Sequence, residues 1–361
     1  MNKEKIQLII ASANLLPGGA ERVLSFLATH IDKEVFDVTL VIFGFEKDVA
    51  YDIDGIKAYY FNKTRIVYGS FRFFKVLKRE KPDLVITAVG HLNTMAAFMS
   101  WFFPKTKFVA REVSINSVIS RFTRYTFHPL MWLGKYRFRF LDAVICQSNQ
   151  MVEDIRSTYT VDPDKITVIP NPVTHKFKLK QAIPDLKEMK LITVGRISGE
   201  KGLERLVNLL KRLEFPFHYT LIGNGPDREK ILNLIAAEGL NEQTTYIEYT
   251  AEVGNYLSDS HVFLQGSYSE GFPNAVLESA AVGTPVVAYA APGGLVEIIE
   301  DDVNGYIVDT EDEFVERLNA LYKDYKFKPE PIRESVMRKF KSDIVLKKYE
   351  DLFKDLVATH S

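Results

Sequence analysis

Short apolar segments alternate with helical patterns along the chain, and this alternation limits its fold more than any other feature. In the first half, strand-like segments lie at residues 6–13, 38–43, 84–89, 107–110 and 143–147. Helical patterns separate them, for example at residues 20–31, 71–79 and 149–158. Strands that are apolar on both faces and joined by helices are typical of parallel sheets covered on both sides. The pattern therefore predicts an α/β fold.

The same alternation begins again after a segment rich in proline and lysine. Its strand-like segments lie at residues 191–194, 219–222, 262–264 and 285–288. A chain of 361 residues is long enough for two cores. We therefore predict two Rossmann-like domains, at residues 1–170 and 189–340, joined by a linker at residues 171–188. In such sheets ligands bind at the carboxyl ends of the strands, which here means a cleft between the domains.

The charge of the chain is unevenly distributed. Residues 1–170 hold 23 Lys and Arg against 17 Asp and Glu, although the whole chain carries a net charge of only -1. Within that half, residues 63–81 and 121–140 mix basic with aromatic side chains. Such segments can contact an anionic membrane peripherally. Alternatively, they are half-buried helices that bury their aromatic side chains and extend Lys and Arg into solvent. Nothing else in the sequence indicates nucleic acid.

Two apolar segments resemble targeting or membrane signals. Residues 6–10 follow two lysines, but they form a run too short for a signal peptide and fit a first strand. Residues 84–104 carry no formal charge, yet polar residues interrupt them, which predicts a buried strand at 84–89, a polar loop and a helix at 95–103. The single cysteine, Cys146, excludes an internal disulfide. We expect the protein to be cytoplasmic, in a location that can include the inner face of the cytoplasmic membrane.

The stretch at residues 266–278, GSYSEGFPNAVLE, reads as a strand end, a glycine-containing loop and a helix start. Pro273 suits a first helical turn and Asn274 can cap it, so free amides and the helix dipole would face a phosphate. Glu278 lies one turn further on, where it suits the hydroxyls of a ribose, and Glu270 would reach another part of the same ligand. The residues expected to bind this ligand are Glu270, Gly271, Phe272, Asn274, Ala275, Val276 and Glu278.

Other strand ends supply further candidates. Arg196 and Lys201 follow the first strand of the second half and together suit a pyrophosphate leaving group. Gly18 and Gly19 follow the first strand of the chain, where the backbone can approach a diphosphate, although a plain turn is the alternative. His91 follows the strand at 84–89 and can contact a sugar hydroxyl or have no role.

Taken in order, these segments resemble the retaining glycosyltransferases of family four, also called group 1, which have the GT-B fold. The resemblance rests on E-x7-E at Glu270 and Glu278, on GGAER at residues 18–22, on IPNPV at 169–173 and on VGR-x4-KG at 194–202. It implies that Glu270 approaches the transferred sugar, that Glu278 binds the nucleotide ribose and that His91 contacts the donor sugar. It also implies a carboxy-terminal helix, within residues 341–361, that crosses back to the first domain.

Metal and cofactor signals are weak. Two Asp-x-Asp strings begin at Asp52 and Asp162, both in turn-rich sequence. No zinc-ligand spacing occurs, and no GxGxxG fingerprint for NAD is present. We expect metal-independent transfer without a cofactor, in which Arg196 and Lys201 stabilise the leaving nucleoside diphosphate.

The resemblance implies an enzyme that moves a sugar from a nucleoside-diphosphate sugar to a glycan or polyprenyl-linked acceptor in cell-surface polysaccharide or glycoconjugate biosynthesis. A UDP-sugar is favoured as the donor, and GDP-mannose comes second. Two alternatives stay open: an inactive sugar-nucleotide-binding scaffold and a nucleotide-sugar epimerase.

Overall fold

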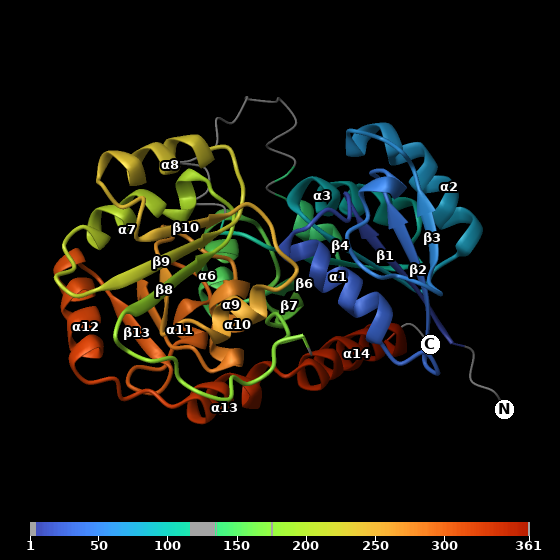
Figure 1. Cartoon of the computed structure of the whole chain (residues 1–361). Coiled ribbons are helices and arrows are strands. Elements are labelled where there is room, and N and C mark those ends of the chain that lie inside the picture. The colour runs from blue at the N-terminus through green and yellow to red at the C-terminus, as the bar shows by residue number, and fades with distance from the viewer. Residues whose placement is uncertain (1–4, 116–133, 135, 175, 360–361) are drawn as a thin grey trace. The chain divides into compact units, whose positions relative to one another are not determined.

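The computed structural model describes residues 5–115, 134, 136–174 and 176–359. The chain forms two compact units, which we describe separately (Figure 1). The first contains the strands β1 to β7 and the carboxy-terminal helix α14, and the second contains β8 to β13. Both sheets are parallel throughout the described strands. This is the two-domain α/β arrangement of the GT-B fold.

The first unit is built on a sheet with the strand order β3-β2-β1-β4-β5-β6-β7. Chain order reverses between β1 and β4, so the loops that follow these two strands leave the sheet side by side. The strands are β1 (Ile6–Ser12), β2 (Phe36–Ile42), β3 (Lys57–Tyr60), β4 (Leu84–Ala88), β5 (Lys107–Arg111), β6 (Ala143–Cys146) and β7 (Ile166–Val168).

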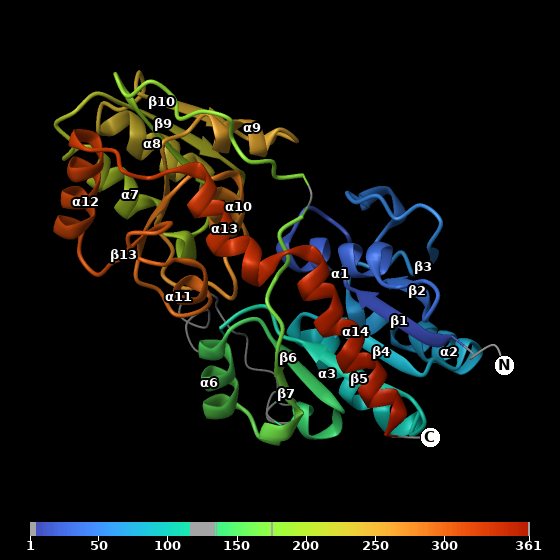
Figure 2. The ribbon, with the colours of Figure 1, turned by 90° about the horizontal axis from the view of Figure 1, so that it is seen from below.

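Helices cover both faces of this sheet. One core cluster joins α1 and α14 to the sheet through residues such as Leu24 and Tyr349, and the other joins α2, α3 and α6 through residues such as Phe73. Figure 2 shows α1 and α14 on the same side of β1 and β4. The α-helices are α1 (Gly19–His30), α2 (Ser70–Glu80), α3 (Gly90–Met99), α6 (Asn149–Thr158) and α14 (Ser342–Ala358). The 3-10 turns are η1 (Glu46–Asp48), η2 (Ile66–Gly69), η3 (Ser100–Phe102), η4 (Arg137–Phe140) and η5 (Pro163–Lys165).

The carboxy-terminal helix belongs to the first unit. Its apolar side places Val345, Tyr349 and Phe353 in the core beside the sheet, and all three are buried. The spacing of four residues between them is that of one helix face. The expected return of the last helix to the first domain is therefore confirmed.

The second unit repeats the architecture with the strand order β10-β9-β8-β11-β12-β13. Its strands are β8 (Met189–Val194), β9 (Phe217–Ile222), β10 (Thr244–Ile247), β11 (Val262–Gln265), β12 (Val286–Tyr289) and β13 (Gly305–Val308). Its helices are η6 (Gly199–Lys201), α7 (Leu203–Leu210), α8 (Arg228–Ala237), α9 (Val253–Ser258), α10 (Asn274–Val282), α11 (Leu295–Ile298), α12 (Glu311–Lys323) and α13 (Pro329–Phe340). Helix α7 contacts α8 and α12, whereas α10 contacts α9, α11 and α13.

One expected element was wrong. The polar loop predicted after residue 89 is the beginning of α3, which starts at Gly90. Its polar residues are compatible with a helix because they have partners: Asn93 is buried and donates to Glu112 at 2.7 Å, and the Thr94 hydroxyl donates to the carbonyl of Gly90 at 2.8 Å. His91 therefore lies in the first turn of a helix and not in a loop.

Candidate active site

The second unit brings its candidate residues together where its strand order reverses. Strands β8 and β11 are parallel neighbours, so the loops at residues 195–202 and 266–273 leave the same edge of the sheet. This is where ligands bind in open α/β sheets. Arg196 and Lys201 lie on the first loop, and Glu270 lies on the second.

Glu270 is buried and is held by three side chains. Lys201 Nζ donates to Glu270 Oε1 at 2.7 Å and to Oε2 at 2.9 Å. Gln265 Nε2 and Ser267 Oγ also donate to Oε1, at 2.7 and 2.5 Å. Oε1 thus receives three hydrogen bonds, whereas Oε2 receives one from the described residues. The arrangement fixes the carboxylate and leaves the acceptor capacity of Oε2 incompletely used.

The two loops touch through glycines. Gly202 has φ +58°, and a Cβ atom there would lie 2.0 Å from the carbonyl oxygen of Gly266. Any other residue would push the loops apart, so Gly202 sets the distance at which Lys201 meets Glu270. Arg205 holds the same loop from α7: its Nε donates to the Gly266 carbonyl at 2.5 Å, and its guanidinium lies over the rings of Tyr268 and Tyr289 at 4.2 and 4.0 Å.

A third segment closes against Glu270 from the other side. Gly293 has φ +125°, and a Cβ atom there would lie 1.5 Å from the carbonyl oxygen of Glu270. The Glu270 amide donates to the Pro292 carbonyl at 3.0 Å, and the Gly294 amide donates to the Gly271 carbonyl at 3.1 Å. Gly293 and Gly294 therefore pack against the loop that carries Glu270.

Helix α10 carries the second glutamate. Pro273 occupies the N-cap position without a side-chain cap and Asn274 is the first helical residue, so the expectation that Asn274 caps the helix was wrong. Glu278 lies on this helix and is buried. Phe272 and Val276 have buried side chains within the apolar core, which leaves only their main chain for a ligand. Ala275 is half-buried.

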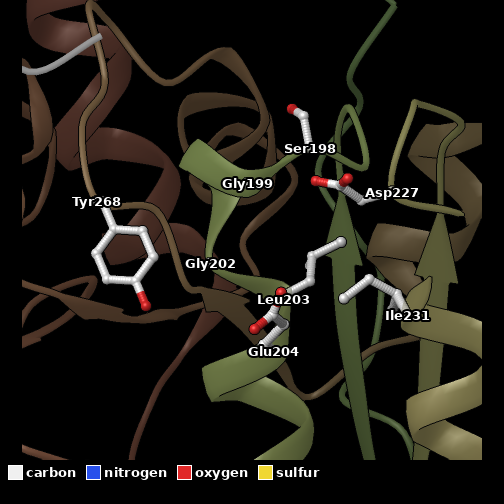
Figure 3. Close-up of a pocket in the computed structure, with 8 residues that line it drawn as sticks. All are labelled: Ser198, Gly199, Gly202, Leu203, Glu204, Asp227, Ile231 and Tyr268. Atoms are coloured by element: carbon white, nitrogen blue, oxygen red, sulfur yellow. The ribbon is translucent and has the colours of Figure 1, made fainter. Parts of the chain in front are cut away.

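A pocket of about 190 Å³ lies beside the first loop. Tyr268 lies on one side of the Gly199–Gly202 turn, and Asp227 and Ile231 lie on the other (Figure 3). Arg196 is exposed, and among the described residues it has no hydrogen bond or ion pair. A free guanidinium and a lysine paired with a carboxylate therefore lie on one loop.

The candidates of the first unit lie at its own point of reversal, after β1 and β4. Gly18 precedes α1 in an extended conformation, and its amide and carbonyl both bind the hydroxyl of Tyr51 at 2.8 Å. Gly19 is the first residue of α1. His91 is exposed and has no hydrogen bond among the residues that the structure describes. Val89 precedes this helix with φ +78°, a conformation that β-branched residues rarely adopt.

Arg111 and Glu112, at the end of β5, are buried. Arg111 Nε donates to the Tyr349 hydroxyl at 2.9 Å, and its Nη2 donates to Asn171 Oδ1. Glu112 Oε1 accepts from Asn93 at 2.7 Å and from Arg137 at 3.0 Å. These side chains hold the first unit together and do not line an acceptor surface.

Several remaining expectations concern membranes and metals. Of the basic segment at 121–140, residues 121–133 and 135 lie outside the described residues. No helix in the described part of the chain is both long and apolar enough to span a membrane.

The described residues also contain no group of three or more His, Cys, Asp and Glu placed to hold a metal ion. Asp52 and Asp162 each accept the amide two residues further on, at 3.0 and 3.1 Å, as in ordinary Asp turns.

Two family models match consecutive parts of the chain. Glycosyltransferase Family 4 matches residues 17–177, and Glycosyl transferases group 1 matches residues 175–336. The solved structure of Anabaena HepE in complex with UDP and glucose superposes with a TM-score of 0.79 at 16% identity, covering 97% of this chain and 100% of that one.

Two named relatives extend over most of the chain. The Campylobacter jejuni N-acetylgalactosamine-N,N'-diacetylbacillosaminyl-diphospho-undecaprenol 4-alpha-N-acetylgalactosaminyltransferase is 23% identical over 90% of this chain and 92% of its own length. The Escherichia coli UDP-Gal:alpha-D-GlcNAc-diphosphoundecaprenol alpha-1,3-galactosyltransferase is 23% identical over 99% of both. The matched family models, the two parallel sheets and the contact between Lys201 and Glu270 agree. The chain therefore belongs to the family 4, group 1 glycosyltransferases of the GT-B fold.

Proposed function

We propose that this glycosyltransferase transfers a sugar, with retention of anomeric configuration, from a nucleoside-diphosphate sugar to a lipid-linked or glycan acceptor. A UDP-sugar is the favoured donor, with GDP-mannose second. The proposal rests on two neighbouring loops. Lys201 of the first loop donates two hydrogen bonds to Glu270 of the second, whereas Arg196 of the first loop is exposed and unpaired within the described residues. One loop then offers two cations to a diphosphate, and the other offers an oriented carboxylate to the sugar.

In this proposal the cations act on the leaving group. The guanidinium of Arg196 has all its donors available for phosphate oxygens, and Lys201 can share its ammonium between Glu270 and the phosphate. Their positive charge would stabilise the diphosphate as its bond to the sugar breaks. No metal or other cofactor is required, and the nucleotide sugar is a co-substrate.

Glu270 is proposed to hold and polarise the sugar and not to attack it. A good nucleophile needs a basic oxygen, but Lys201 donates to both oxygens of Glu270 and lowers their basicity, and Gln265 and Ser267 also bind Oε1. Oε2 is left to accept a sugar hydroxyl and to face the positive charge that develops at the anomeric carbon. In a front-face reaction the acceptor oxygen bonds to that carbon as the phosphate leaves, and the phosphate takes the acceptor proton. Glu278 is proposed to bind the ribose, and His91 to contact the donor sugar.

The proposed acceptor follows from the relatives. The Campylobacter and Escherichia proteins are named for diphospho-undecaprenol substrates, and the Escherichia protein is named for a UDP-sugar. Carried to this chain, these names favour a polyprenyl-linked acceptor, bound mainly by the first unit, in polysaccharide biosynthesis. The proposed location is cytoplasmic, at the inner face of the cytoplasmic membrane.

A nucleotide panel tests the donor site. Thermal unfolding would be followed with millimolar UDP, GDP, ADP and dTDP for the wild type, Arg196→Ala and Glu278→Ala. Arg212→Ala is the matched control, since Arg212 is a partly exposed arginine of the same unit whose partners are the surface acids Glu311 and Asp312. We expect one diphosphate to raise the midpoint selectively in the wild type and the control, and neither active-site variant to respond fully.

Turnover separates the three functions. Slow hydrolysis of the selected nucleotide sugar, followed by NMR, should release a sugar of the donor's own anomeric configuration before it mutarotates. Binding without any release or transfer to an acceptor would identify a scaffold, and release of an epimer would identify an epimerase. An inverted product would refute the retaining mechanism while leaving the donor site intact.

A further inference from the structure

Exposed aromatic side chains gather at one end of the first unit. Phe98, Trp101 and Phe102 lie at the end of α3 and in η3, with exposed fractions of 61%, 65% and 55%, and Phe140 in η4 is 40% exposed. The ring centroids of Phe98 and Phe102 lie 5.5 Å apart, and those of Trp101 and Phe140 lie 5.1 Å apart. We call these four residues the aromatic cluster.

The two ring pairs of the cluster lie on neighbouring elements. The Ser100 hydroxyl donates to the Phe140 carbonyl at 2.9 Å, which fixes η4 beside η3. On the other side, Phe74 of α2 contacts the ring of Phe102 at 5.8 Å. The uncharged segment at 84–104, expected from its sequence to be buried, is buried through its strand and half of α3, and it ends in exposed aromatic rings.

Exposed basic side chains lie on the elements that neighbour the cluster. Helix α2, whose Phe74 contacts Phe102, exposes Lys75 and Lys78, and Lys75 Nζ lies 4.5 Å from the ring centre of the exposed Phe71. Its two arginines have other partners, because Arg72 donates to the Phe61 carbonyl and Arg79 donates to Glu80. Arg139 is exposed beside Phe140, and Lys105 is exposed shortly after η3. The acid on α2 is Glu80, and it is already paired with Lys57 and Arg79. Lys75, Lys78, Lys105 and Arg139, which we call the basic rim, have no ion pair with any acid that the structure describes.

This combination favours a lipid surface over the other possible occupants. Large exposed aromatic patches on soluble domains indicate an interaction site, and Trp and Phe beside Lys and Arg are typical of the interface of an anionic membrane. A second copy of the chain is a poor occupant, because a two-fold contact through this surface would bring two basic rims together. The exposed rings pack edge-on against one another instead of standing apart as stacking platforms for bases.

We propose that the aromatic cluster inserts into the interface of an anionic phospholipid bilayer and that the basic residues of α2 bind the lipid headgroups. The proposal deepens the proposed function, on which its biological purpose rests, because a polyprenyl-linked acceptor is held in such a bilayer. The binding itself needs neither donor nor acceptor. Within the segments expected to contact a membrane, 63–81 and 121–140, it selects α2 and η4, and it adds the end of α3 and η3.

Vesicle binding tests the surface directly. The full chain without nucleotide would be sedimented with vesicles of neutral phosphatidylcholine or of phosphatidylcholine containing phosphatidylglycerol. We expect binding to the anionic vesicles, a loss of about tenfold or more in Trp101→Ser/Phe102→Ser, and a salt-sensitive loss of similar size in Lys75→Glu/Lys78→Glu. Tyr249→Ser is the matched control, because Tyr249 is 73% exposed and lies in the second unit.

Fluorescence gives a second readout that does not depend on sedimentation. The chain has two tryptophans, so Trp132→Phe leaves Trp101 as the reporter. A blue shift and quenching by brominated lipid on addition of anionic vesicles would place Trp101 in the bilayer. Unchanged emission, or full binding by Trp101→Ser/Phe102→Ser, would overturn the proposal, as would self-association through the cluster without vesicle binding.

The thermal unfolding panel with nucleoside diphosphates separates the proposed transferase function from the proposed membrane binding. The vesicle-binding variants are expected to retain the thermal response to nucleoside diphosphate, which also shows that they are folded. A protein that binds vesicles but no nucleotide would refute the proposed function alone, whereas one that binds nucleotide but no anionic vesicles would refute the inference drawn here.

Discussion

Replacement of Gly293 by alanine should damage the active site through a single methyl group. The added Cβ atom would lie 1.5 Å from the carbonyl oxygen and 2.6 Å from the carbonyl carbon of Glu270, whereas real Cβ contacts stay beyond 3.0 Å. The two segments must therefore separate by about 1.5 Å. They are joined by the hydrogen bonds from Glu270 to Pro292 and from Gly294 to Gly271, so the separation moves the loop that carries the carboxylate.

The size of the effect follows from two contributions. Alanine at a positive φ costs about 1–2 kcal/mol of folding free energy, and forced displacement of a packed segment costs about 1–3 kcal/mol more. A shift of about 1 Å in a catalytic group lowers turnover about 100-fold. We expect Gly293→Ala to lose about 2–5 kcal/mol of stability and at least 100-fold in activity with the nucleotide sugar.

Gly239→Ala is the control for the backbone conformation alone. Gly239 also has a positive φ, +72°, but a Cβ atom there meets nothing within 4 Å. This variant should lose about 1 kcal/mol and keep its activity. Urea unfolding gives the two stabilities, and initial rates with saturating donor give the two activities. Wild-type turnover in Gly293→Ala, or an equal loss in both variants, would refute the idea that Gly293 sets the position of Glu270.

Two further predictions concern buried polar groups. Burial lowers the pKa of Lys180 from 10.5 to about 8, so between these two pH values the unfolded chain binds more protons than the folded chain. As the pH rises from 8 to 10.5, the unfolding free energy of the wild type should therefore increase by about 3 kcal/mol relative to that of Lys180→Met. Equal pH profiles of the two proteins in urea unfolding would contradict the assignment. Asn93→Ala removes a donor to Glu112 and an acceptor for Thr87 in the core of the first unit, so it should cost about 2–4 kcal/mol, and a loss below 0.5 kcal/mol in the same assay would show that the network is not needed.

The sequence pattern predicted the central strands of both sheets and missed the edges. The four strands without a prediction are β3, β7, β10 and β13, and they are the four edge strands. Edge strands are covered less completely, so they need fewer apolar residues, and β3 (Lys57–Tyr60) and β10 (Thr244–Ile247) contain no fully buried residue. Apolar runs identify strands only where both faces and both neighbours are covered.

The candidate site divides in a similar way. Glu270 and Lys201 were identified from their local motifs, and their contact at 2.7 Å was not predicted because it joins residues 69 apart in the chain. Gln265 and Ser267 were missed although they lie only five and three residues before Glu270, because neither carries a charge that would mark it in the sequence. A polar residue at the end of a strand was the available signal for Gln265.

Arg111 and Arg196 show why a strand-end arginine alone does not indicate a site. Arg111 is the last residue of β5, which pairs with β4 and β6 on either side, and α14 covers its side chain, so its Nε and Nη2 donate to protein groups. Arg196 lies two residues beyond the end of β8, in a turn outside the sheet, where it is exposed and unpaired within the described residues. A guanidinium already bonded to protein can add little to a ligand, whereas an unpaired one keeps its full capacity. Arg111 and Arg196 differ because the first lies within a strand that is paired on both sides and the second lies in a turn beyond its strand. Only the folded chain reveals this difference.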